Sequence, residues 1–324
     1  MFLFGASTSS HQVEGNTYNQ WSVWEYENAS KLARKARKKF GKLSSWPYIY
    51  KKAQDPHNYI SHTGADHYNK FEQDFDLAKS LGHNAHRLSI EWSRIEPREG
   101  EFDEKEIEHY KKVILALKSR GIEPFVTLWH WTIPVWLYDA KGFATPFAVK
   151  RFEIFVEKIV TALGSDIKFW VTLNEPEVYL GASYIKGQWP PQKRNIFLAR
   201  KVLNNLLFAH RSAYKIIKKI NPEAQVGIAK NNIYFESAGG FVNNFLTNIS
   251  SWFSNRLILS LIKKHQDFIG LNYYFHSRVN YGFGKNKNAK VSDLGWELYP
   301  EGLYNVLGEL HKYQDKINLK IHLK

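Results

Sequence analysis

The sequence has no cysteine among its 324 residues, which excludes disulfide bonds and thiolate metal sites. No apolar run is long enough to span a bilayer, and the opening residues 1–5 are too short and lack the basic start of a signal peptide. No glycine, serine or proline-rich linker divides the chain. We therefore expect a single domain over residues 1–324 in a soluble, cytoplasmic protein.

Acidic residues are missing from residues 31–52, which hold nine Lys or Arg and so supply much of the formal net charge of +14. The string KLARKARKKFGK within this segment predicts a short helix with Leu32, Ala36 and Phe40 on one side. A solvated basic face is the ordinary interpretation of such a segment. Contact with nucleic acid or anionic lipid is the alternative.

Aromatic residues at positions 46, 48 and 50 follow the basic string. Rings at alternate positions suit base stacking, but they suit a half-buried strand better. We interpret residues 28–55 as a basic helical insertion in the domain. Neither nucleic acid nor a membrane is expected as the main partner.

Short apolar segments of β-prone composition recur along the chain and alternate with helical patterns. One helix is predicted from Asp103, with Glu106 as its capping-box partner, to Gly121, and another from about Ile196 to the stop at Asn221. Strands that alternate with helices indicate parallel βα units. The predicted strands are residues 2–6, 85–90, 124–129, 169–173, 225–229, 268–272 and 317–323.

The position of polar side chains favours a closed barrel over an open sheet. Residues 5–10 lack the glycine spacing of a dinucleotide-binding turn. Polar and aromatic side chains instead follow several predicted strands, as is usual at the C-terminal face of a (β/α)8 barrel. These residues are Gln12, His130, Trp131, Asn174, Glu175, Asn272 and Tyr274.

The most informative local motif is residues 170–176, where a buried strand runs directly into Asn174-Glu175-Pro176. A carboxyl group at a strand end among aromatic residues loses solvation, which raises its pKa and prepares it to donate a proton. Asn174 is placed to hydrogen-bond a substrate hydroxyl. An ordinary loop carboxylate is the competing interpretation of Glu175.

A second motif, Trp129-His130-Trp131, offers aromatic faces for the C–H groups of a sugar and an imidazole for its hydroxyls. The histidines lie on separate segments without ligand spacing, so neither a metal nor another cofactor is expected. Arg87, within the second predicted strand, either pairs with active-site carboxylates or forms a buried structural ion pair.

Six ordered motifs across residues 4–303 resemble glycoside hydrolase family 1, the β-glycosidases. They are residues 4–15 (FGASTSSHQVEG), 86–94 (HRLSIEWSR), 127–131 (TLWHW), 172–176 (TLNEP), 267–274 (DFIGLNYY) and 295–303 (GWELYPEGL). The resemblance implies a TIM-type (β/α)8 barrel and a retaining enzyme with two carboxylates.

The resemblance also implies roles at matching positions. Glu175 is then the general acid/base, and Arg87, Asn272 and Tyr274 support the nucleophile. The implied substrate contacts are Gln12, His130, Trp131, Asn174 and Trp296. The expected ligands are β-glucosides or β-galactosides.

The sequence departs from the family pattern at its end. The family's seventh strand ends in a Thr-Glu-Asn-Gly-like segment that carries the nucleophile, whereas residues 316–324 here read KINLKIHLK. We therefore expect a C-terminally truncated family member whose barrel lacks the eighth βα unit. The open edge of the barrel is then exposed to water, or it is covered by another copy of the chain. Glu236, Glu297 and Glu301 are conceivable substitute nucleophiles, although Glu301 resembles a first-turn helix carboxylate.

Three explanations of the short end stay open at this level: an interrupted enzyme, a related chain that supplies the rest, or a fold kept for binding. The leading hypothesis is a glycosidase acting through Glu175, with weak or lost turnover. A non-catalytic sugar-binding protein is the second. A protein that binds nucleic acid or membranes through its basic segment is the third.

Overall fold

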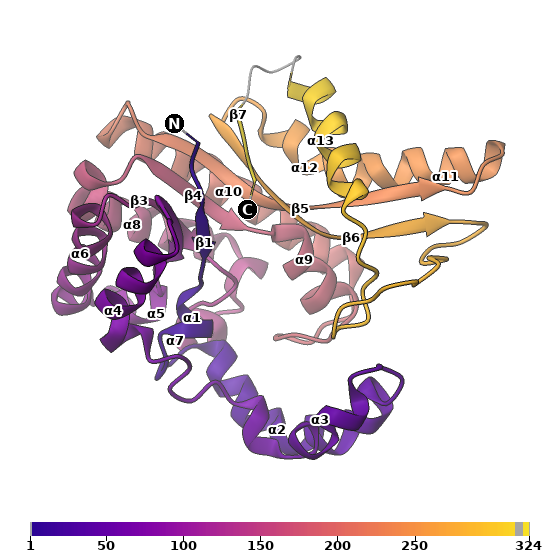
Figure 1. The fold of residues 1–324 in the computed structure, drawn as a ribbon. Helices are drawn as coiled ribbons and strands as arrows, with labels where there is room; N and C mark the ends of the chain where they lie inside the picture. The colour runs from indigo at the N-terminus through magenta and orange to yellow at the C-terminus, as the bar shows by residue number, and fades with distance from the viewer. Residues whose placement is uncertain (1, 315–319, 324) are drawn as a thin grey trace.

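The computed structural model describes residues 2–314 and 320–323. Its centre is a curled sheet of seven parallel strands in sequence order, with helices on the outer face (Figure 1). The strands are β1 (Gly5–Ser7), β2 (Ala85–Ser89), β3 (Glu123–Trp129), β4 (Phe169–Asn174), β5 (Gln225–Ser237), β6 (Phe268–Val279) and β7 (Lys320–Leu323).

The helices alternate with these strands, which confirms the predicted βα units. They are α1 (Ser10–Val13), α2 (Gln20–Phe40), α3 (Trp46–Ala53), α4 (His67–Ser80), α5 (Trp92–Ile95), α6 (Glu104–Ser119), α7 (Val135–Asp139), α8 (Pro146–Leu163), α9 (Pro176–Leu180), α10 (Ile196–Ile220), α11 (Phe241–Ser251), α12 (Leu257–Ile262) and α13 (Glu301–Gln314). None of the described helices is both long and apolar enough to cross a membrane.

The sheet is an incomplete (β/α)8-type barrel. Each strand pairs in parallel with its sequence neighbours, from β1 with β2 through β6 with β7. Within the described residues, β1 and β7 have no further strand beside them, and all three residues of β1 are exposed. Residues 317–319 of the predicted last strand lie outside the described residues.

Alternation along the strands separates two apolar cores. Side chains such as Val126, Trp170 and Ile228 point to the helices and join the large core. Phe169 and Phe268 form a smaller core with Phe125 packed against it. Phe125 and Phe169 stack with ring centroids 4.2 Å apart, so aromatic side chains fill the inside of the curl.

The predicted helix caps are partly confirmed. The Asp103 carboxylate accepts hydrogen bonds from the amides of Lys105 and Glu106, as an N-cap should. The reciprocal half of the capping box is absent in this described region, because the Glu106 carboxylate accepts a hydrogen bond from the Tyr68 hydroxyl instead. Gly121 follows the helix with φ +67°, as expected of a helix stop.

The basic segment is helical, but its boundaries differ from the expectation. Helix α2 begins at Gln20, with Asn19 as its N-cap, and continues to Phe40 with Ala33 and Ala36 buried. The strand suggested by the alternating rings at 46, 48 and 50 is wrong, because these residues lie in helix α3.

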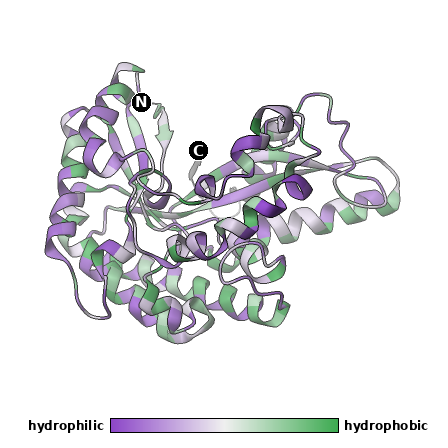
Figure 2. Cartoon of the chain, turned by 90° about the horizontal axis from the view of Figure 1, so that it is seen from below, coloured by the Kyte–Doolittle hydropathy of each residue, from purple (hydrophilic) through white to green (hydrophobic). Residues whose placement is uncertain are grey.

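The physical reason is the spacing of the half-buried residues in α3. Trp46, Ile49 and Ala53 recur at helical intervals and carry the half-buried positions, while Tyr48 is 87% exposed. Pro47 occupies the first turn of α3, where its missing amide hydrogen costs nothing. The hydropathy colouring in Figure 2 shows hydrophilic and hydrophobic residues interspersed along the outer helices.

Candidate active site

Glu175 lies at the junction between strand β4 and helix α9, and it is only 4% exposed. Pro176 ends the strand, as predicted, and begins α9. The backbone of Glu175 is left-handed, with φ 43° and ψ 58°, whereas a residue before proline is ordinarily extended. Such a conformation costs about 1–3 kcal/mol and is typical of functional positions. A hydrogen bond of 2.7 Å from the Glu175 amide to the carbonyl of Ala229 on β5 holds it.

The carboxyl group of Glu175 is buried among polar side chains from β6. Asn272 Nδ2 donates to Glu175 Oε1 at 2.5 Å, and the Tyr274 hydroxyl also hydrogen-bonds this carboxylate. Burial raises the pKa of Glu175 above its ordinary value, and the hydrogen bonds together with the Arg87 cation only partly oppose that rise. A carboxyl group of raised pKa holds its proton further toward neutral pH, as a general acid requires.

Arg87, Asn174 and His130 form one hydrogen-bonded chain across three strand ends. Arg87 Nη2 donates to Asn174 Oδ1 at 2.7 Å, and its Nε donates to Thr127 Oγ1 at 2.6 Å. The Asn174 amide is 3.1 Å from His130 Nε2. Burial lowers the pKa of Arg87 to about 10 and that of His130 well below its usual value. His130 is therefore a neutral imidazole at pH 7, able to exchange a hydrogen bond with a hydroxyl.

Several buried polar atoms of this group lack partners within the described part of the chain. They are Arg87 Nη1, His130 Nδ1 and Asn272 Oδ1, on β2, after β3 and on β6. An unpaired buried polar atom costs about 1–3 kcal/mol, so three at one end of a sheet call for a ligand or water. A molecule rich in hydroxyl groups supplies both the donors and the acceptors that these atoms need.

Aromatic side chains lie beside the polar group. Trp131 Nε1 donates to the carbonyl of Asn174 at 2.9 Å, and its ring stacks with that of Trp21 at 6.2 Å. Trp189 packs against both of these rings. Trp296, which is 40% exposed, lies 6.1 Å from the Tyr274 ring. These faces suit the C–H surface of a sugar.

Gln12 is the least connected of the predicted site residues. Its side chain is exposed, and Oε1 accepts a hydrogen bond of 2.8 Å from Ser9 Oγ. Its neighbour His11 contacts the Trp21 ring at 6.2 Å, which places α1 beside the aromatic group. The structure thus brings together Arg87, His130, Asn174, Glu175, Asn272 and Tyr274 by direct contacts, with Trp131, Trp296 and Gln12 around them.

Sequence reasoning missed a buried cation behind Glu175. Lys230 on β5 is 0% exposed, and its Nζ lies 3.2 Å from Glu177 Oε1 while it donates to the carbonyls of Asn231 and Ser254. Glu177 also accepts a 2.7 Å hydrogen bond from the Asn231 amide. The pair fixes the turn that follows Glu175. A lysine in an otherwise apolar strand, IAKN, was the available signal.

The substitute nucleophiles considered from the sequence are engaged elsewhere. Glu236 and Glu297 both approach His276 Nε2, at 3.5 and 3.4 Å. Glu301 lies in the first turn of α13, which confirms its interpretation as a helix-terminus carboxylate. No group of three or more His, Asp or Glu is placed to hold a metal ion among the residues described.

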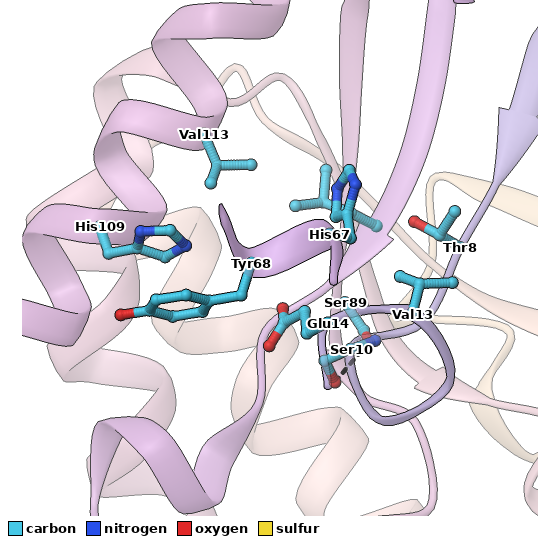
Figure 3. A pocket seen from close by; sticks show the side chains of 10 residues that line it. Thr8, Ser10, Val13, Glu14, His67, Tyr68, Ser89, His109 and Val113 are labelled. Carbon is cyan, nitrogen blue, oxygen red and sulfur yellow. Dashed lines mark hydrogen bonds between the residues drawn. The ribbon is translucent and has the colours of Figure 1, made fainter. Parts of the chain in front are cut away.

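A separate buried cluster lies beside β2, away from Glu175. Figure 3 shows Glu14, Tyr68, His67 and His109 around a cavity of about 10 Å³, which has room for about one water molecule. Glu14 accepts a hydrogen bond from Arg94 Nε at 2.9 Å and another from the Tyr110 hydroxyl at 2.8 Å. Burial nevertheless raises the pKa of Glu14 to about 7.

A parallel barrel with a buried carboxyl group and hydroxyl-matching amides at the strand ends is an arrangement that suits an O-glycosyl hydrolase. Comparison with known proteins identifies the family. Residues 1–240 match the model of glycosyl hydrolase family 1, and the chain belongs to that family. It is 30% identical to beta-glucosidase A of Thermotoga maritima, covering 94% of this chain and 73% of that protein.

Other relatives and solved structures that the chain resembles are also β-glycosidases. The chain is 27% identical to a beta-galactosidase of Pyrococcus woesei, over 77% of this chain and 69% of that one. The structure superposes on a beta-glycosidase from Pyrococcus horikoshii with a TM-score of 0.82 and 30% identity, covering 99% of this chain and 74% of the other. The structure also superposes on a family 1 β-glucosidase from Thermotoga maritima with a TM-score of 0.82 and 27% identity, covering 100% of this chain and 77% of the other. The incomplete barrel predicted from the sequence is confirmed by these neighbours.

Proposed function

We propose that the site binds terminal β-linked glucosides or galactosides, with Glu175 as the acid/base that protonates the departing oxygen. The carrying observation is the buried Glu175 carboxyl, which is hydrogen-bonded by Asn272 and lies next to the Arg87–Asn174–His130 chain. Neighbouring structures contain sugar-like inhibitors such as deoxynojirimycin, which supports a sugar as the ligand here. His130, Asn174, Trp131, Trp296 and Gln12 are the proposed contacts.

The proposed step is protonation of the glycosidic oxygen by Glu175 as the bond to the anomeric carbon breaks. A carboxylate supplied by a second chain is proposed to attack that carbon and take up the glycosyl group, which water then releases as the free sugar; Arg87 and Tyr274 would orient this carboxylate, as in a retaining mechanism. The unpaired Nη1 of Arg87 is the cationic donor available for that role. Because Glu175 must be protonated, the rate should fall as pH rises through its raised pKa.

The test is hydrolysis by Glu175→Gln, which keeps the size of the side chain but has no acidic proton. We expect cellobiose turnover to fall by about 10²–10⁴-fold. Release of nitrophenol from an aryl β-glucoside should fall less, because that leaving group needs little protonation. Glu99→Gln, at an exposed position, is the matched control. Equal activity of Glu175→Gln and the parent chain on cellobiose would refute the assignment.

Sugar binding without hydrolysis is the second candidate, because Glu236 and Glu297 lie beside His276 rather than in contact with Glu175 among the described contacts. Calorimetry of the parent chain with glucose, cellobiose and deoxynojirimycin separates the two. Binding without nitrophenol release supports a binding protein. Binding with release that Glu175→Gln reduces supports the enzyme, and no binding contradicts both.

A further inference from the structure

Helix α11 and the π-helix that continues it, Trp252–Arg256, present their apolar side chains to solvent. The exposed fractions reach 86% for Phe241, 54% for Phe245 and 57% for Phe253. Spacings of three and four residues place these side chains on one side of the helix. We call this surface the apolar face of α11; it consists of Phe241, Val242, Phe245, Ile249, Trp252 and Phe253.

The polar side of the same helix is the buried one. Asn243, Ser251 and Asn255 are 4%, 9% and 0% exposed. Asn255 hydrogen-bonds both the amide and the carbonyl of Ile233 on β5, at 3.0 and 2.9 Å. Ser251 and Asn255 also donate to the Glu309 carboxylate on α13. Turning the helix to bury its apolar face would break these hydrogen bonds, so the outward orientation is fixed.

The loop after β6 enlarges the apolar face. The Tyr281 amide donates to Asn243 Oδ1 at 2.8 Å, which ties this loop to the first turn of α11. Tyr281 is 81% exposed and Phe283 is 55% exposed. Figure 1 shows α11 and the far ends of β5 and β6 projecting together beyond the rest of the chain. The exposed rings therefore lie on a protruding part of the molecule.

The exposed charges of this part that have no ion pair among the described residues are of one sign. Between residues 237 and 292 the sequence holds seven Lys or Arg, and Asp267 is its sole acidic residue. Asp267 lies at the opposite end of β6, where Tyr214 and Lys218 bind it. Arg256 and Arg278 pair with Glu309 and Glu236. The exposed lysines on the loop after β6 have no ion pair in the described part of the chain; they are Lys285, Lys287 and Lys290. Lys263 and Lys264 lie with Asp267 at the opposite end of β6.

We propose that the apolar face of α11 docks on an anionic lipid bilayer. Phe and Trp side chains enter the interface, and the unpaired lysines lie near the phosphate groups. A second copy of the chain fits less well, because two cationic surfaces of the same sign repel each other. A bilayer accepts protruding rings without a matching cavity. This inference is independent of the proposed hydrolysis, and it revises the expectation, based on residues 31–52, that a membrane is not a partner.

The test is sedimentation of the whole chain with vesicles of phosphatidylcholine, alone or mixed with phosphatidylglycerol. We expect binding to the mixed vesicles that weakens with added salt. Phe245→Ser combined with Trp252→Ser should reduce the partition coefficient by about tenfold or more. Both side chains are exposed, so the fold should persist, and the melting temperature checks this. Phe197→Ser is the matched control, since Phe197 is 83% exposed but lies on α10.

A second variant tests the charge. Lys285→Gln, Lys287→Gln and Lys290→Gln together should lower binding to the mixed vesicles. The proposal is overturned if the parent chain does not bind the mixed vesicles, or if Phe197→Ser loses as much binding as the α11 variant. Self-association that the α11 variant abolishes, without vesicle binding, would assign the surface to a second copy instead.

Discussion

Helices α8 and α11 direct their apolar side chains in opposite directions. Phe152 and Phe155 of α8 are 0% exposed and pack in the large core, whereas Phe241 and Phe245 of α11 are 86% and 54% exposed. In α8 the hydrophobic effect decides the orientation. In α11 the side-chain hydrogen bonds of Asn243, Ser251 and Asn255 decide it. Helical periodicity therefore identifies a helix but not the face of it that packs against the protein.

The most direct test of the difference between α8 and α11 compares the stability of two variants, Phe155→Ala and Phe245→Ala. Phe155 stacks on Trp92 with ring centroids 4.9 Å apart, so its removal leaves a cavity and should lower the free energy of unfolding by about 3–5 kcal/mol. Phe245→Ala should change it by less than about 0.5 kcal/mol. Urea unfolding measures both. A similar loss in the two variants would mean that α11 is packed in solution.

Glu14, in the buried cluster beside β2, is a polar group that is packed inside the protein. Its folded-state pKa of about 7 lies above the ordinary value of 4.5, so the folded chain keeps this proton while the unfolded chain loses it. The free energy of unfolding should therefore fall as pH rises from 4.5 to 7, by at most about 3 kcal/mol.

Glu14→Gln should remove this part of the pH dependence and stabilise the protein relative to the parent chain near neutral pH. Urea midpoints measured across this pH range give the slope. Glu99→Gln, at an exposed position, should leave the slope unchanged. An unchanged slope in Glu14→Gln would show that other groups cause the pH dependence.

Asn255→Ala tests the polar attachment of α11. The substitution leaves the amide and carbonyl of Ile233 without their side-chain partner and should cost about 1–3 kcal/mol. Hydrogen exchange should then rise in residues 241–256. Asn248→Ala, on the exposed surface of the same helix, is the control. No change in exchange would show that Asn255 does not hold the helix in place.

Most of the barrel follows from local pattern. The predicted starts of β2 to β6 agree with the structure within one residue, because apolar runs of this length bounded by turn residues have few other stable arrangements. Strands β5 and β6 extend to Ser237 and Val279, beyond the predicted ends. Their outer parts pair with each other, and such pairing depends on the partner strand rather than on composition.

The candidate active site also combines features that local sequence predicts with features that depend on distant residues. Sequence order alone determined that Asn174 and Glu175 lie at the end of β4 and that Arg87 lies in β2, because these positions are set by the chain's own strands. Tertiary structure alone decided the left-handed backbone of Glu175 and its contact with Asn272, 97 residues away. It also decided the pairing of Lys230 with Glu177 and the outward apolar face of α11. Each of these depends on which distant groups share a low-dielectric site or a hydrogen bond, and that information is absent from any single stretch of sequence.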